Sequence, residues 1–190
     1  MDDIQILREM LVDSAMMKPE KVYSKFKVTL TEPQCPDSSV EIKGIPENAI
    51  VIKIDNFPAP SSLFRGNKGE CKRADYLIIA EYENKKKVLK KCVLFIELKR
   101  KTDSANEIKQ QLIGAACCFR YIQEIGRRFW NNPKLLTNFE HRYICFRHTE
   151  SVSKRSTRYS KDSGKHNSPD NIFEIDWPKK NIIFNHLAGA

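Results

Sequence analysis

Two acids and one lysine stand at the ends of two apolar stretches of the chain. Asp75 directly precedes the apolar residues 76–79, and Glu97 with Lys99 ends a second apolar stretch. Side chains at positions i and i+2 of a strand point to the same face. Glu97 and Lys99 should therefore project side by side, while Leu98 points into the opposite layer.

The polar residues 83–87 between these stretches predict an antiparallel hairpin. Counted from a turn centred near Lys85, Asp75 lies opposite about residue 95, and a bulge or a small register offset would bring it to Glu97. The hairpin therefore predicts that the two carboxylates approach each other.

Two carboxylates that meet in a buried place repel each other, so they need a shared proton or a cation. Mg²⁺ prefers oxygen ligands, and Asp75, Glu97 and the main-chain carbonyl of Leu98 would supply such a set, with Mn²⁺ as a substitute. Lys99 could then hold or help deprotonate an attacking water and balance charge at a phosphoryl group. The simpler alternative is a solvated strand end in a lysine-rich chain, where an E-x-K triplet is common by chance.

A long helix is predicted over residues 105–129, capped by Asp103 or Ser104. Gln111 falls near the apolar side of this helix. It could contact the catalytic residues, or it could be a boundary residue without a role. The conjunction of this glutamine with the acids and the lysine favours the catalytic interpretation.

This set of residues resembles the PD-(D/E)XK nuclease superfamily, which carries an aspartate on one strand, (D/E)-x-K on the next, and often a glutamine on the following helix. Ala74-Asp75 matches the first motif without its proline, and Glu97-Leu98-Lys99 matches the second. The resemblance covers about residues 69–125. It implies an α/β fold with a mixed central β-sheet flanked by α-helices, a restriction-endonuclease-like core of order αβββαβ.

The resemblance also implies roles for these residues. Asp75 and Glu97 would be metal ligands, Lys99 would position the water, and Gln111 would touch the lysine, the water or a substrate phosphate. Phosphodiester hydrolysis would use a metal-activated water without a covalent intermediate. A fourth acid could take part, with Glu9 on the N-terminal helix (residues 2–17) and Glu70 as the candidates.

Charge indicates the kind of partner. The 190-residue chain has a net charge of +9, which favours nucleic acid first and an anionic membrane surface second. Residues 65–101 hold twelve basic residues against five acidic ones. Phosphate contacts are therefore expected from basic side chains in this region and in a polar segment further on, namely Arg73, Arg100, Lys101, Arg155 and Arg158.

That polar segment, about residues 147–171, is predicted to be a mobile basic loop that clamps nucleic acid or is simply disordered without it. Strands are predicted over residues 21–30, 49–57, 74–82, 88–98, 141–146, 172–175 and 182–184, with a proline-bearing loop over residues 31–39. The first two strands could form a β-ribbon or extend the central sheet.

The length predicts a single domain over residues 1–190, with the core motifs in residues 69–146. The N-terminus is acidic, and no apolar run is long enough to span a membrane, so no membrane partner and a cytoplasmic location are expected. The six scattered cysteines are interpreted as free thiols.

The resulting hypothesis is a Mg²⁺-dependent nuclease that acts on DNA rather than RNA. It could belong to a defence system or a mobile element, and could work as a homodimer or with a helicase or sensor subunit. The alternative is a non-catalytic module that keeps the nuclease fold and binds nucleic acid or protein.

Overall fold

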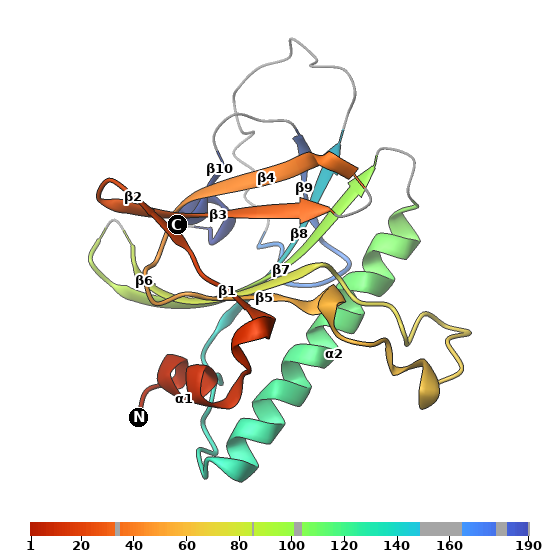
Figure 1. The fold of residues 1–190 in the computed structure, drawn as a ribbon, viewed down its shortest axis with the longest axis horizontal. Helices are drawn as coiled ribbons and strands as arrows, with labels where there is room; N and C mark the ends of the chain where they lie inside the picture. The colour runs from red at the N-terminus through yellow and green to blue at the C-terminus, as the bar shows by residue number, and fades with distance from the viewer. Residues whose placement is uncertain (33–34, 85, 101–103, 149–164, 178–181, 190) are drawn as a thin grey trace.

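Two mixed β-sheets packed face to face and one long helix make up the fold (Figure 1). The computed structural model describes residues 1–32, 35–84, 86–100, 104–148, 165–177 and 182–189; the side chains of residues 35–38, 100, 148 and 177 lie outside this description. The strand order is β1-β5-β6-β7-β8-β9 in the larger sheet and β10-β4-β3-β2 in the smaller one. The chain therefore belongs to the mixed α/β class.

The larger sheet consists of β1 (Met16–Met17), β5 (Ile50–Lys53), β6 (Tyr76–Glu83), β7 (Leu89–Arg100), β8 (Glu140–His148) and β9 (Phe173–Trp177). The smaller sheet consists of β2 (Glu20–Val22), β3 (Lys25–Glu32), β4 (Cys35–Ile45) and β10 (Ile182–Ile183). The helices are α1 (Asp3–Met10), α2 (Ala105–Phe129) and α3 (Phe184–Leu187), with 3₁₀ turns η1 (Asp13–Ala15), η2 (Ile54–Asn56) and η3 (Pro60–Ser62). The pairings β5–β6 and β6–β7 are antiparallel, whereas the pairings β7–β8 and β8–β9 are parallel.

The larger sheet is apolar on both faces, because it is covered on both. Even-numbered residues of β6 and β7, such as Ile78 and Leu94, pack against the smaller sheet. Odd-numbered residues, such as Ile79 and Phe95, pack against α1 and α2. Burial on both faces explains the continuous apolar runs that lead to the acidic residues. The expected covering by helices is therefore observed on one face, whereas a second sheet, which the sequence did not indicate, covers most of the other.

The helices differ in how closely they follow the prediction. Helix α2 has the predicted bounds, and Ser104 caps it by accepting a hydrogen bond from the Glu107 N–H at 3.2 Å. The N-terminal helix was predicted to reach residue 17, but α1 ends at Met10 because Leu11 is already extended. Within the described ranges, no helix has the length and apolar character needed to cross a membrane.

The smaller sheet overturns two predictions. The single strand predicted over residues 21–30 is the hairpin β2–β3, whose turn is made by Tyr23 with a φ of 54°. The loop predicted over residues 31–39 is wrong, because β4 begins at Cys35. Pro36 is tolerated in β4 because it stands near the start of the strand, where the pairing with β3 changes register.

The remaining strand predictions are close to the structure. Residues 49–57 contain β5 followed by η2, and β5 extends the larger sheet. Residues 141–146 lie within β8, and residues 172–175 and 182–184 overlap β9 and β10. None of the five cysteines whose side chains are described forms a disulfide.

Candidate active site

Asp75 and Glu97 lie opposite each other at the end of the β6–β7 ladder. This ladder pairs Tyr76 with Ile96 and continues regularly to the hairpin turn. One further step places Asp75 opposite Glu97, so the turn is centred on residue 86 and the predicted pairing of Asp75 with about residue 95 is wrong. The predicted approach of the two carboxylates is confirmed, and no bulge is needed for it.

The two carboxylates replace main-chain partners where β6 begins. The Leu98 N–H donates to Asp75 Oδ2 at 2.7 Å, and the Asp75 N–H donates to Glu97 Oε2 at 3.2 Å. The Asp75 carbonyl accepts a hydrogen bond from the Ile54 N–H at 2.8 Å, which fixes the residue to the end of β5. The backbone of three strands therefore orients both acids.

Both acids are buried. Glu97 is fully buried and Asp75 is 9% exposed. Burial raises the pKa of both carboxyl groups above the ordinary range, and the neighbouring Asp75 charge raises the pKa of Glu97 further. The Leu98 N–H and the Lys99 ammonium oppose the increase in the pKa of Asp75. Without a cation, the pair therefore tends to keep a proton at neutral pH.

Lys99 lies beside Glu97, as the strand alternation predicts. Its Nζ is 3.0 Å from Glu97 Oε1 and its side chain is 17% exposed, so the ammonium connects the buried acids to the surface. Leu98 points the other way and packs in the layer between the two sheets. The side-by-side arrangement of Glu97 and Lys99 is confirmed.

A divalent cation with oxygen ligands fits this pair. Glu97 Oε1 is buried and has no hydrogen-bond partner in the described part of the chain, although it forms an ion pair with Lys99. In a strand, the N–H and C=O of one residue point to the same side. The Leu98 carbonyl therefore points to the side on which its N–H meets Asp75. Among the described residues no group of three or more His, Cys, Asp or Glu side chains could hold a metal, so the acidic ligands here would be two.

Helix α2 packs close to the segment that leads to Asp75. A Cβ on Gly114 would lie 1.8 Å from the Lys72 carbonyl oxygen, so only a glycine permits this approach. Gln111 lies one turn earlier in α2, and its Oε1 is buried without a hydrogen-bond partner among the described residues. No described contact joins Gln111 to Asp75, Glu97 or Lys99, so its predicted role stays a prediction.

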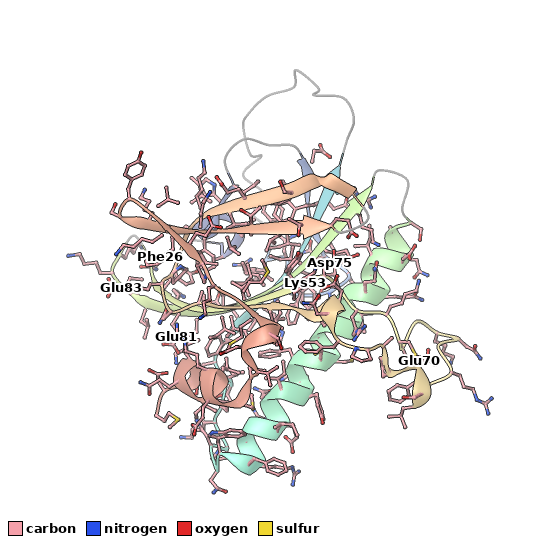
Figure 2. The ribbon with its side chains drawn as sticks, viewed as in Figure 1. Phe26, Lys53, Glu70, Asp75, Glu81 and Glu83 are labelled. Carbon is pink, nitrogen blue, oxygen red and sulfur yellow. The ribbon has the colours of Figure 1, made fainter. Side chains whose placement is uncertain are left out.

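The two candidates for a fourth acid have other partners. Glu70 accepts hydrogen bonds from the N–H groups of Gly66 and Lys68, at 2.9 and 2.8 Å, and these bonds lower its pKa. Figure 2 shows it far out in its loop, whereas Asp75 lies near the centre of the view. Glu9 accepts a hydrogen bond from the indole of Trp130, which follows the last residue of α2. Trp130 lies sixteen residues, about 24 Å of helix, beyond Gly114, which approaches the segment before Asp75, so Glu9 is remote from the pair.

The predicted phosphate-binding residues are only partly described. The Arg73 guanidinium donates to the Pro58 carbonyl at 2.9 Å, which gives it a role in holding its loop. The side chain of Arg100 and the residues Lys101, Arg155 and Arg158 lie outside the described residues.

Both ends of the basic loop predicted over residues 147–171 differ from the prediction. Strand β8 continues to His148. Residues 165–171 pack beside β8, because the Tyr143 N–H donates to the His166 carbonyl at 2.9 Å and Arg142 donates to the Lys165 carbonyl. Residues 149–164 lie outside the described part of the chain.

Sequence reasoning missed Tyr76, which ties the two sheets together beside the acids. Its hydroxyl donates to the Thr31 carbonyl at 2.6 Å and accepts from the Thr31 N–H at 2.9 Å. A tyrosine in a fully buried run needs a partner for its hydroxyl, and that signal was available in the sequence. The partner of this hydroxyl could not be predicted from the sequence, because Thr31 was assigned to a loop.

A chain-wide comparison with known proteins gives no assignment. No family model matches the chain, and searches of curated proteins and of solved structures find no match either. The chemistry of the acid pair is therefore the basis for a function.

Proposed function

We propose that this protein is a metal-dependent nuclease that hydrolyses phosphodiester bonds of nucleic acid, with DNA as the favoured substrate. The observation that carries the proposal is the pair Asp75 and Glu97, buried opposite each other and oriented by main-chain N–H groups, with Lys99 at 3.0 Å from Glu97. Two adjacent buried carboxyl groups whose pKa values are both raised, mainly by burial, are typical of acid–base or metal sites.

The order of elements supports the same proposal. Reading along the chain, α1, β5, β6, β7, α2 and β8 follow the αβββαβ order of the PD-(D/E)XK core, with Asp75 directly before the second of these strands and Glu97 on the third. The smaller sheet and α3 would then be additions that cover the second face. The excess of basic residues between positions 65 and 101 would attract the phosphate backbone.

Each residue has a role that follows from its position. Asp75 and Glu97, with the Leu98 carbonyl, would hold one divalent cation, Mg²⁺ or Mn²⁺. When bound, the cation supplies positive charge to a phosphoryl oxygen and lowers the pKa of water. Lys99 connects the buried acids to the surface, so it can orient the attacking water and neutralise the charge that develops on phosphate. The burial of Glu97 keeps bulk water away from the charges and strengthens these interactions.

Metal binding tests this proposal without relying on turnover. We expect Mn²⁺ titrated into the protein by calorimetry to bind with release of protons, because the carboxyl groups with raised pKa must ionise to bind it. Asp75→Asn and Glu97→Gln should each lose this binding. Glu9→Gln, a matched change at a remote acid, should keep it. Equal Mn²⁺ binding by Glu97→Gln and the parent would contradict the proposal.

A further inference from the structure

A pocket of about 420 Å³ opens between the first turns of α2 and the segment that leads into β9. Helix α2 contributes Asn106 and Lys109, and the opposite wall contributes Pro169, Asn171, Ile172 and Glu174. An ion pair between Lys109 and Asp170 joins the two walls. Ala105 adds an apolar side chain to the α2 wall, so the pocket has polar and apolar groups on both sides.

The pocket adjoins the acid pair along one row of the larger sheet. Glu97 on β7 pairs with Cys145 on β8, and Cys145 pairs with Glu174 on β9. Paired residues of parallel strands point to the same face, and neighbouring strands are about 4.8 Å apart. The Cα atoms of Glu97 and Glu174 are therefore separated by about 10 Å, on the face that α2 covers.

The charges of the pocket are balanced. Asp170 is paired with Lys109, and Glu174 accepts two hydrogen bonds from the Arg147 guanidinium, at 3.0 and 3.2 Å. A site for a phosphate would instead present a surplus of positive charge. Because the charges of the lining are balanced, the pocket is better suited to an uncharged group of a ligand than to a phosphate.

The side chains of the lining suit a nucleobase. Asn106 and Asn171 lie on opposite walls, and each amide can both donate and accept hydrogen bonds at the edge of a base. Pro169 and Ile172 offer apolar contact to the flat face of a base. The volume lies within the range of about 300–1,000 Å³ that small-molecule sites occupy.

We propose that this pocket holds one unpaired nucleotide of the strand that Asp75, Glu97 and Lys99 cleave. The inference rests on the proposed nuclease function and names its substrate class, which is single-stranded nucleic acid or a duplex opened beside the cut. A paired base cannot enter, because it must first leave the stack.

Binding of defined oligonucleotides in EDTA tests this inference. The probe is a fluorescein-labelled oligodeoxythymidine, followed by anisotropy, and it is compared with an abasic strand of equal length and charge. We expect the strand with bases to bind about tenfold more tightly, since two hydrogen bonds to the edge of one base are together worth a factor of this order. Asn106→Ala and Asn171→Ala should each reduce the preference severalfold, whereas Asn138→Ala, at an exposed asparagine outside the pocket, should retain it.

The outcomes distinguish a failure of the pocket inference from a failure of the proposed nuclease function. Equal binding of the two strands by the parent protein, or an unchanged preference in both pocket variants, would overturn the inference. Alanine is a strong helix former, so Asn106→Ala should fold, and circular dichroism checks this. Because EDTA prevents cleavage, a base preference without cleavage in Mg²⁺ would reject only the nuclease function. Cleavage without a base preference would reject only the pocket.

Discussion

Gly114→Ala should disturb the acid pair from a distance, because this glycine sets the separation between α2 and the segment before Asp75. The added Cβ would lie 1.8 Å from the Lys72 oxygen and 3.4 Å from the Arg73 Cα. Ordinary carbon–oxygen contacts are about 3.3–3.6 Å, so the segment or the helix must move by about 1.5 Å. Asp75 follows Lys72 by three residues and would move with it.

The effect on activity should be much larger than the effect on stability. Overpacking of this kind costs about 1–3 kcal/mol, and replacing glycine by alanine inside a helix returns about 1 kcal/mol. The net loss of unfolding free energy is therefore at most about 2 kcal/mol. A misplacement of about 1 Å can reduce a reaction rate about 100-fold, so cleavage should fall by that order.

Gly126→Ala is the matched control on the same helix. Its Cβ would meet Leu135 Cδ2 at 2.1 Å, and this methyl group ends a side chain that can change rotamer. The two glycines are twelve residues apart, about 18 Å along the helix. Urea unfolding should show a loss for Gly126→Ala no larger than that for Gly114→Ala, because a side-chain methyl yields more easily than backbone, and cleavage rates should fall only for Gly114→Ala. Equal cleavage rates in the two variants would refute the reasoning.

Two further changes test the electrostatics and the connection between the sheets. Burial raises the pKa of Glu97, so the metal-free protein should lose stability as the pH rises from about 4, the ordinary carboxyl pKa, through the raised one. Glu97→Gln should flatten this dependence in urea unfolding series in EDTA, and an unchanged slope would contradict the assigned pKa direction. Tyr76→Phe leaves the N–H and C=O of Thr31 without their hydroxyl partner. Urea unfolding should show a loss of about 1–3 kcal/mol, and a loss near zero would mean that water replaces the hydroxyl.

The elements that carry the acid pair could be predicted from the sequence, because strong local patterns specify them. The alternation around Glu97 predicted that Leu98 and Lys99 point to opposite faces, and the capping candidates Asp103 and Ser104 predicted where α2 begins. The centre of the hairpin turn differed by one residue, which moves the partner of Asp75 by two residues, from about 95 to 97. A polar turn of several lysines does not define its own centre, whereas the packing of β6 between β5 and β7 does.

The smaller sheet could not be predicted, because the local sequence patterns of its strands differ from the strand pairing that the folded chain adopts. The sequence around Pro36 is typical of a loop, yet the backbone there pairs with β3 across a change of register. Tyr23 adopts a positive φ that usually requires glycine or asparagine, so the turn between β2 and β3 had no local signature. The pocket beside β9 was missed for a related reason. It is formed by residues more than sixty positions apart, and only the parallel pairing of β8 with β9 brings them to the acid pair.

The most direct measurement of the central claim is cleavage of labelled single-stranded DNA, double-stranded DNA and RNA by the purified protein and by Lys99→Ala. Each substrate is incubated with Mg²⁺, with Mn²⁺ and with EDTA. We predict that the parent protein cuts at least one of the DNA substrates with either metal, and that EDTA and Lys99→Ala abolish cutting. Cutting by Lys99→Ala at the parent rate, or no cutting by the parent with any metal, would contradict the account.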